Sequence, residues 1–436
     1  MSSFLHQVIL ATHVATSVTL AADCDWSPLG TGAGPAVYGC AALEDGSVVF
    51  GGSISGIDGQ FVNRIAIWDG SAWSQPGNGV NGFVRSIVAL SGGGFIAGGH
   101  FTRAGGMNAG LIARWDGTQW HAFGDGLDAG SCRAILSTGD GKVIAAGSFL
   151  QADNQPAWGI AEWDGVAWSK LGNNTLGGGV SGWFTPEPSP TMVLDLIEMP
   201  TGEIIACGNF TGVDGVPMRG IASWDGVQWN PLGSGVNNVP RAMTLLPSGD
   251  LLVAGNFSEA GGVDCYGLAI WDGFTWSAVG NGLNGTNGSS YWDLETTSNG
   301  KVILSGFFHM VDSVPANNIA IYDPTSDEWS PLGTGMIPAI QTTVWDATVS
   351  ADGTIYAGGQ FSSAGGNSDA WNVALYDCLG ACPADLNNDG SLNFLDVSAF
   401  LSLFSASDPA ADLTNDGQFN FLDVSAYLSS YSAGCP

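Results

Sequence analysis

Apolar residues in this chain occur in short runs separated by Gly, Asp and Asn. Residues 84–90, 94–101, 111–115 and 119–123 form one set of four such runs, and the pair Asp116-Gly117 separates the last two. Glycine readily takes the positive φ that a two-residue hairpin turn requires. The pattern therefore predicts four short strands that pair as an antiparallel sheet.

The same set recurs along most of the chain. The Asp that closes the third run occurs seven times, at Asp69, Asp116, Asp164, Asp225, Asp272, Asp323 and Asp377. The Trp that opens a W-x-x-L-G element also occurs seven times, at Trp26, Trp73, Trp120, Trp168, Trp229, Trp276 and Trp329. Strand-type repeats with a period of about 40 to 50 residues are typical of β-propellers. We predict an all-β fold over residues 23–378, a seven-bladed β-propeller with four-stranded blades whose repeated aromatics pack between blades.

The repeats begin and end in mid-unit. Trp26 belongs to a fourth strand with no first three before it, and Asp377 ends a third strand with no fourth after it. Pairing of these two segments would close the ring and remove exposed sheet edges. Cys24 and Cys378 would then occupy neighbouring positions of one hairpin, and we predict a disulfide between them. Cys40, Cys132, Cys207 and Cys265 lie at unmatched positions in four units and are expected to be buried free thiols.

Composition fits this architecture and excludes some partners. The 436 residues include 66 Gly and 17 Trp, and 40 acidic residues against 10 basic ones give a formal charge of −30. A phosphate backbone requires a basic surface, so nucleic acid is excluded as a partner. An anionic membrane surface is disfavoured for the same reason. We expect the propeller to be monomeric.

The first 22 residues resemble a secretory signal peptide. Residues 8–22 are apolar and end in small residues, although no Lys or Arg precedes them and His13 interrupts them. No other stretch is apolar for long enough to span a bilayer. The expected location is therefore secreted or associated with the cell surface.

The pattern changes after Cys378. Two loops, 385–396 and 412–423, place oxygen donors at positions 1, 3, 5, 9 and 12, a backbone carbonyl at position 7 and Gly at position 6. This is the donor arrangement of EF-hand loops, which bind Ca²⁺ through hard oxygen ligands. The predicted ligands are Asp385, Asn387, Asp389, Ser391, Asn393, Asp396, Asp412, Thr414, Asp416, Gln418, Asn420 and Asp423.

Each loop should lead into a helix with one apolar face. The residues of these faces are Val397, Phe400, Leu401 and Phe404 in the first helix and Val424, Tyr427, Leu428 and Tyr431 in the second. Two such units would pack face to face into a core that is small without metal or a covalent link. Cys382 and Cys435 flank the unit and are predicted to supply that link.

The duplicated D-x-N/T-x-D-G-x-L/F-N-x-x-D loops resemble those of dockerins, and the flanking Cys382 and Cys435 are similar to those of planctomycete dockerin-like tails. The resemblance covers residues 379–436. It implies two bound Ca²⁺ ions and a cohesin-like partner contacted through a helix face. In dockerins, loop positions 10 and 11 help to choose the partner; here they are Phe394, Leu395, Phe421 and Leu422.

The propeller repeats, with G-x-F-x-x-A-G-G, I-A-x-W-D-G and W-x-x-L-G elements, resemble those of kelch-like and fungal polarity-marker extracellular propellers. This resemblance concerns architecture and says little about activity.

One set of residues lies where each predicted innermost strand begins. Six of its seven members are Tyr38, Arg85, Arg133, Arg241, Trp292 and Trp345, and Leu194 is the seventh. Asp195, Asp293 and Asp346 follow one position later, and Trp183 lies in a long loop predicted at the same mouth of the channel. Aromatic rings with Arg and Asp suit a glycan or an acidic small ligand. The alternative is that the arginines pair with the aspartates and close the channel.

No catalytic constellation is evident, because the five histidines are scattered and no nucleophile elbow or metal-binding pair is present. The leading hypothesis is a secreted binding or display module, anchored to a cohesin-like partner by its Ca²⁺-dependent tail. The alternative is a carbohydrate-active enzyme, a glycoside hydrolase or polysaccharide lyase, with its site at the channel mouth.

Overall fold

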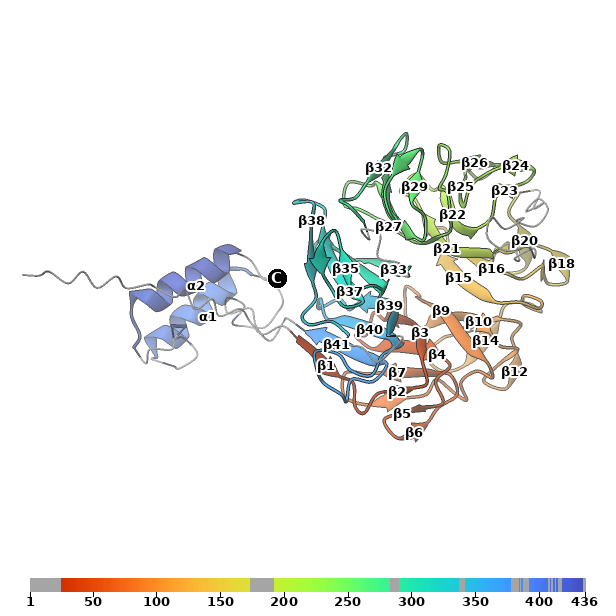
Figure 1. Cartoon of the computed structure of the whole chain (residues 1–436). Coiled ribbons are helices and arrows are strands. Elements are labelled where there is room, and N and C mark those ends of the chain that lie inside the picture. The colour runs from red at the N-terminus through yellow and green to blue at the C-terminus, as the bar shows by residue number, and fades with distance from the viewer. Residues whose placement is uncertain are drawn as a thin grey trace, which may run out of the picture. The chain divides into compact units, whose positions relative to one another are not determined.

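The computed structural model describes residues 25–172, 192–282, 290–336, 342–377, 384, 386, 392–406, 408, 411, 413–414 and 418–433. The chain divides into two compact units, one of residues 25–379 and a second that includes residues 380–436 (Figure 1). The predicted signal peptide lies outside the described residues.

Seven antiparallel four-stranded sheets make up the described part of the first unit. From the inner to the outer strand they are: β3 (Val37–Ala42), β4 (Val48–Gly52), β7 (Ile65–Trp68), β8 (Trp73–Ser74); β9 (Phe83–Ala89), β10 (Phe95–His100), β13 (Ile112–Trp115), β14 (Trp120–Ala122); β15 (Cys132–Ser137), β16 (Val143–Gly147), β19 (Ile160–Trp163), β20 (Trp168–Lys170); β21 (Met192–Glu198), β22 (Ile204–Asn209), β25 (Ile221–Trp224), β26 (Trp229–Pro231); β27 (Pro240–Leu245), β28 (Leu251–Gly255), β31 (Leu268–Trp271), β32 (Trp276–Ala278); β33 (Ser290–Thr296), β34 (Val302–Phe307), β37 (Ile319–Asp323), β38 (Glu328–Pro331); and β39 (Thr343–Val349), β40 (Ile355–Gln360), β41 (Val373–Asp377), β1 (Asp25–Pro28).

Shorter strands, which the sequence patterns do not predict, lie in connections between the second and third strands of the sheets, except β2 (Ala33–Gly34), which lies between β1 and β3. Five two-stranded hairpins and one three-stranded sheet are described: β11 (Arg103–Ala104) with β12 (Met107–Asn108); β17 (Gln151–Ala152) with β18 (Gln155–Pro156); β23 (Gly212–Val213) with β24 (Val216–Pro217); β29 (Glu259–Ala260) with β30 (Val263–Asp264); β35 (Met310–Val311) with β36 (Val314–Pro315); and β2 (Ala33–Gly34) with β5 (Gly56–Ile57) and β6 (Gln60–Phe61). Strands of two residues are too short to show a hydrophobic period.

The first strand of each sheet lies nearest the centre of the unit (Figure 1). Each contacts the first strand of the next sheet, in the order β3, β9, β15, β21, β27, β33 and β39, and β39 contacts β3. The outer edge of the last sheet is the N-terminal strand: β1 pairs with β41, with Asp25 opposite Asp377 and Trp26 opposite Tyr376. The red strand β1 therefore lies beside the blue strand β41 in Figure 1.

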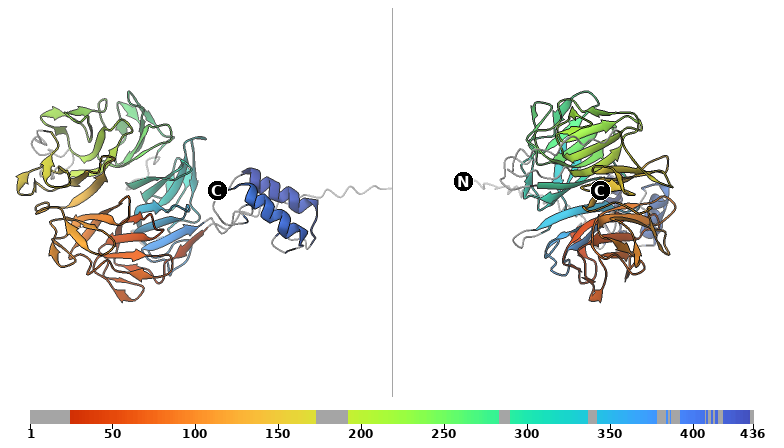
Figure 2. Two further views of the ribbon diagram at one scale, coloured as in Figure 1. Left: turned by 180° about the vertical axis from the view of Figure 1, so that it is seen from behind. Right: turned by 90° about the vertical axis from the view of Figure 1, so that its right-hand side faces the viewer.

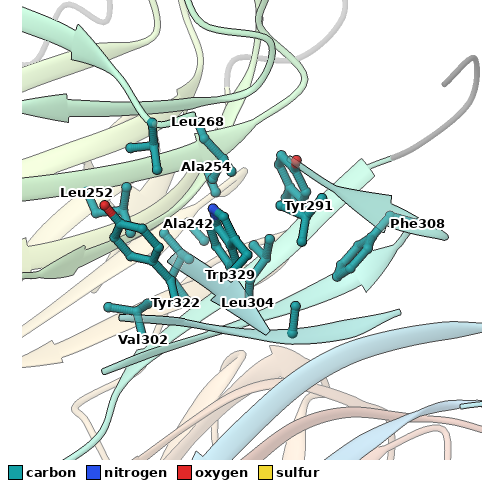
Figure 3. Packing of buried hydrophobic residues seen from close by; sticks show 14 of the residues in the cluster. Ala242, Leu252, Ala254, Leu268, Tyr291, Val302, Leu304, Phe308, Tyr322 and Trp329 are labelled. Atoms are coloured by element: carbon teal, nitrogen blue, oxygen red, sulfur yellow. The ribbon is translucent and has the colours of Figure 1, made fainter. Parts of the chain in front are cut away.

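Neighbouring sheets pack face to face through apolar side chains. Figure 3 shows one such layer, in which Ala242 and Leu252 of one sheet meet Tyr291 and Trp329 of the next. The Trp of the W-x-x-L-G elements is scaffold, because Trp26, Trp120 and Trp276 are 4–7% exposed. Burial of such aromatics dominates core energetics.

Four cysteines of this unit are buried free thiols, as predicted: Cys40, Cys132, Cys207 and Cys265. Cys24, Cys378, Cys382 and Cys435 lie outside the described residues, so both disulfides stay predictions.

Two helices, α1 (Phe394–Ser405) and α2 (Phe421–Ala433), form most of the described second unit, and they lie side by side (Figure 2). Their core is made by Phe400 and Tyr427, whose rings stack with centroids 4.1 Å apart and an interplanar angle of 4°. The predicted apolar faces are too wide, because Leu401 and Leu428 are 56% and 54% exposed. No helix in the described parts of the chain is both long and apolar enough to cross a membrane.

Candidate functional site

A β-bulge occurs at the same place in the first strand of all seven described sheets. The extra residues are Tyr38, Arg85, Arg133, Leu194, Arg241, Trp292 and Trp345, each skipped in the pairing of its strand with the second strand. A bulge leaves one residue unpaired and re-aims its side chain. The repeated bulge is therefore the backbone feature that sets these seven side chains apart from the core.

The bulged residues converge on one pocket. All seven line a cavity of about 110 Å³. They also line a larger cavity of about 450 Å³ that is bounded by residues of all seven first strands. The structure thus brings together every predicted mouth residue except Trp183, which lies outside the described residues.

The seven bulged residues are called the channel layer below. Five of their side chains contact one another in a continuous series. The guanidinium Cζ of Arg85 lies 4.1 Å from the ring centroid of Tyr38, and the Tyr38 centroid is 5.7 Å from that of Trp345. The Trp345 and Trp292 rings are 4.3 Å apart, and Arg241 Cζ lies 4.0 Å from the Trp292 centroid. Cation–π contacts of this kind stabilise a charge by about 0.5 to 2 kcal/mol.

The arginines are not neutralised by the aspartates. Among the described residues, no carboxylate lies within 4.0 Å of the side-chain nitrogens of Arg85, Arg133 or Arg241. The predicted alternative, in which these arginines pair with the aspartates, is therefore wrong for this layer. Burial lowers the pKa of Arg133 and Arg241, and a neighbouring arginine lowers each further.

Two donors in the layer lack acceptors. Arg133 Nε and Trp345 Nε1 are buried and make no hydrogen bond to any described residue. Arg241 Nε, in contrast, donates to Asn256 Oδ1 at 2.7 Å. An unpaired buried donor costs about 1 to 3 kcal/mol, so the layer is short of acceptors.

The three predicted aspartates lie beside the arginine layer but have another role in the structure. Each carboxylate accepts a backbone N–H from the first strand of the following sheet. The bonds are Met243 N to Asp195 Oδ2 at 2.7 Å, Ala347 N to Asp293 Oδ2 at 3.1 Å and Cys40 N to Asp346 Oδ2 at 2.7 Å. These bonds connect neighbouring sheets, so the aspartates have a structural role.

The acids around the cavity hold protons more tightly than usual. Burial raises the pKa of Asp195 to about 7. Asp293 and Asp346 are hydrogen-bonded to each other, and burial raises the pKa of both carboxyl groups, with the Asp293 charge adding to the rise at Asp346. Two carboxyl groups in such contact favour a shared proton.

Glu295 also lines the cavity and was not predicted. Burial, followed by the charge of Asp293, raises the pKa of Glu295 to about 8. Its position could have been found from the sequence, because residues i and i+2 of a strand share a face and Glu295 follows Asp293 by two.

The described part of the second unit holds six of the twelve predicted calcium ligands: Asn393, Asp396, Thr414, Gln418, Asn420 and Asp423. Asn393 and Asp396 form a reciprocal cap of α1, in which Asn393 N donates to Asp396 Oδ2 at 2.9 Å and Leu395 N donates to Asn393 Oδ1 at 2.8 Å. Asn420 and Asp423 repeat this cap at α2. All six donors are hard oxygens, which fits Ca²⁺.

The helices also expose the residues predicted to contact a partner. Phe394 and Phe421 are each 76% exposed, and Leu395 and Leu422 are 59% and 57% exposed. The two halves thus present nearly equal apolar surfaces.

Comparisons with known proteins support a β-propeller. The profile of the Rax2 C-terminal beta propeller domain matches residues 221–351, and that of a beta-propeller domain of unknown function matches residues 138–162. No curated protein matches the chain in sequence.

Solved structures of similar fold are distant. YCF48 bound to D1 peptide is 14% identical over 80% of this chain and 96% of its own, with a TM-score of 0.49. The WD40 beta propeller domain of Doa1 is 14% identical over 81% of this chain and 95% of its own, with a TM-score of 0.48. The extracellular domain of the one component system BT4673 from B. thetaiotaomicron is 11% identical over 81% of this chain but only 40% of its own length, with a TM-score of 0.46. With the profile matches and the sheet order, the described residues of the first unit form a β-propeller.

Proposed function

We propose that this chain is a secreted binding protein whose seven-bladed propeller, closed by strand β1, binds an anionic ligand at the mouth of its channel. The observation that carries the proposal is the absence of any carboxylate partner for Arg85, Arg133 and Arg241 within the described residues. In a protein of charge −30, three of ten basic residues share this one layer.

The layer suits a carboxylate-bearing sugar. Arginine binds carboxylates through a planar fork of donors. The Tyr38, Trp292 and Trp345 rings offer apolar surface beside those donors, and Trp183 is proposed to add a further ring at the mouth. A cavity of about 450 Å³ lies within the range of small-molecule sites.

The tail is proposed to anchor the propeller. Its duplicated loops would bind two Ca²⁺ ions, and the exposed Phe394, Leu395, Phe421 and Leu422 would contact a cohesin-like partner. Calcium would link the loop ends and stabilise the small core around Phe400 and Tyr427.

A carbohydrate-active enzyme is the second candidate, because carboxyl groups with raised pKa line the channel. Glu295, with a pKa of about 8, would be protonated at neutral pH and could act as a general acid. Against this, the Asp195, Asp293 and Asp346 carboxylates already accept backbone N–H groups.

Calorimetric titration of the full chain with tri-galacturonate, in the presence of Ca²⁺, tests the proposal. Replacement of Arg85 and Arg241 by Met, together with Arg133→Leu, should weaken binding at least a hundredfold, whereas Arg114→Met on the exposed side of β13 should not. Equal binding by the triple variant would contradict the proposal. Release of reducing or unsaturated ends, lost in Glu295→Gln, would favour the enzyme.

A further inference from the structure

A second pocket, of about 700 Å³, lies where the last sheet meets β2 and the β5–β6 hairpin. Its lining comes from residues 31–32, 34–35, 55–59, 342, 360–362 and 371–372 and shares no residue with the channel. It is a separate site at the place where the two ends of the propeller sequence meet.

Trp371 is the main aromatic surface of this pocket. Its side chain is 50% exposed. A Cβ atom built on Gly34 would lie 3.8 Å from the Cη2 atom of the indole, an ordinary van der Waals distance, so the ring lies close to the backbone at Gly34. The ring is therefore supported on one side by backbone and accessible elsewhere.

The neighbouring Asn372 fixes the backbone of Trp371. Asn372 is buried, and its Nδ2 donates to Ala33 O at 2.6 Å and to Pro35 O at 2.9 Å, while its Oδ1 accepts from Phe361 N at 2.8 Å. Ala33 N also donates to Trp371 O at 2.9 Å. The indole thus projects from a rigid backbone and would lose little entropy on binding a ligand.

The position of Trp371 recurs in the repeats. It lies just after a buried residue and just before the third strand of its sheet, and Trp158 and Tyr266 occupy the equivalent positions in two other sheets. They are 43% and 50% exposed, whereas the W-x-x-L-G residue Trp276 is 7% exposed. These aromatics are therefore not used for packing between sheets.

Polar groups line the same pocket as the indole, and they define the class of ligand. Ser55, Gln360 and Ser362 line the pocket, and their side chains make no hydrogen bond to another described residue. Asp58 Oδ1 accepts from Thr31 N and Thr31 Oγ1 at 3.1 and 3.2 Å, which leaves Oδ2 for a ligand. The lining contains no Lys or Arg, so the Asp58 carboxylate would repel an acidic ligand.

We infer that this pocket, between the last sheet, β2 and the β5–β6 hairpin, binds a neutral saccharide. An indole face packs against the C–H face of a pyranose, and hydroxyl, amide and carboxylate groups around it bind the ring hydroxyls. An apolar peptide would leave these polar groups unpaired at a cost of about 1 to 3 kcal/mol each. The ligand class differs from that of the channel, so the two sites can be tested separately.

The test is titration of the full chain with cellotetraose, mannotetraose and laminaritetraose, with binding measured by calorimetry and by saturation-transfer NMR. Trp371→Ala should weaken binding of the preferred tetrasaccharide at least tenfold, and Trp371→Tyr should retain most of it. Phe274→Ala is the matched control, because Phe274 is an exposed aromatic outside the pocket. Thermal unfolding of each variant shows whether the propeller is intact.

Three outcomes would overturn the inference. The first is that none of these neutral saccharides binds the wild-type chain at millimolar concentration. The second is that Trp371→Ala binds as well as wild type. The third is that the Arg85, Arg133 and Arg241 triple variant, rather than Trp371→Ala, loses the neutral saccharide, which would place the binding in the channel.

Discussion

The guanidinium of Arg241 lies over the ring of Trp292, with Cζ 4.0 Å from the ring centroid. Arg85 lies over Tyr38 in the same way, at 4.1 Å. In both pairs an aromatic face, and not a carboxylate, accompanies a partly buried cation. A ring stabilises the charge without cancelling it, so both arginines stay charged and without a carboxylate partner among the described residues.

Replacement of Arg133 by Leu tests whether the arginine lowers the stability of the propeller. Arg133 has a buried Nε without an acceptor among the described residues. Leu194 occupies the same bulge position in the next sheet, so leucine is compatible with the backbone. Arg133→Leu should therefore raise the free energy of unfolding by about 1 kcal/mol in urea denaturation, while weakening binding of an acidic trisaccharide.

Arg114→Leu serves as the control, since Arg114 is exposed and should change neither quantity. A loss of stability of more than about 1 kcal/mol in Arg133→Leu would show that the arginine is structural.

The channel acids predict an unusual pH dependence. Asp195 and Glu295 have folded-state pKa values of about 7 and about 8, against about 4 in an unfolded chain. The folded state therefore binds more protons between pH 4 and 8, and stability falls as pH rises through this window, by at most about 1.4 kcal/mol per pH unit for each group.

Asp195→Asn should remove part of that slope in urea unfolding measured from pH 4.5 to 8.5, and exposed Asp264→Asn should not. The turn aspartates Asp69 and Asp225 have pKa values lowered by backbone hydrogen bonds. Their contribution to the stability of the fold is therefore present at neutral pH and is lost only as pH falls below about 4. A stability that is constant between pH 4.5 and 8.5 would contradict the assignment.

The repeat period made the channel layer predictable. Once the repeats are aligned, Arg85, Arg133 and Arg241 must share a register, and the structure brings them together with the aromatic residues at the same register. The bulge that turns them out of the strands was not predictable, because it is a property of backbone pairing and carries no residue signature here. The sequence also did not show where the aspartates bond: the carboxylate of Asp195 accepts the backbone N–H of Met243 and not an arginine.

In the second unit, the sequence did not predict which residues of the helices are buried. A helical period places Leu401 beside Phe400, but a helix of 12 residues packed against a single partner buries only a narrow stripe. Phe400 is buried and Leu401 is not, which sequence periodicity alone does not resolve.

Calcium removal should affect the two units differently. Calorimetric titration of the full chain should detect two Ca²⁺ ions, and Asp389→Ala or Asp416→Ala should each remove one. Addition of EGTA should reduce the helical signal in far-ultraviolet circular dichroism, because the core around Phe400 and Tyr427 is too small to persist alone. The propeller's unfolding transition should be unchanged.

Asp408→Asn is the matched control for the calcium variants, since Asp408 lies between the two loops. Binding of no calcium by the wild-type chain, or a helical signal that resists EGTA, would refute the calcium-dependent fold.

The predicted Cys24–Cys378 disulfide can be tested from the register of the adjacent residues. Asp25 lies opposite Asp377 in the β1–β41 pair, and in the sequence Cys24 directly precedes Asp25 and Cys378 directly follows Asp377. Oxidised protein should yield a peptide that links these cysteines in mass mapping.

Cys24→Ser should lower the propeller's melting temperature, since a bridge closing a loop this long stabilises the fold by at most about 5 kcal/mol in the chain-entropy model. Reductant should lower the melting temperature of the wild-type propeller but have no further effect on Cys24→Ser. Detection of both thiols in the free state would exclude the bridge; β1 would then be held by its pairing with β41, by burial of Trp26 and by the hydrogen bond from Trp26 Nε1 to Leu332 O.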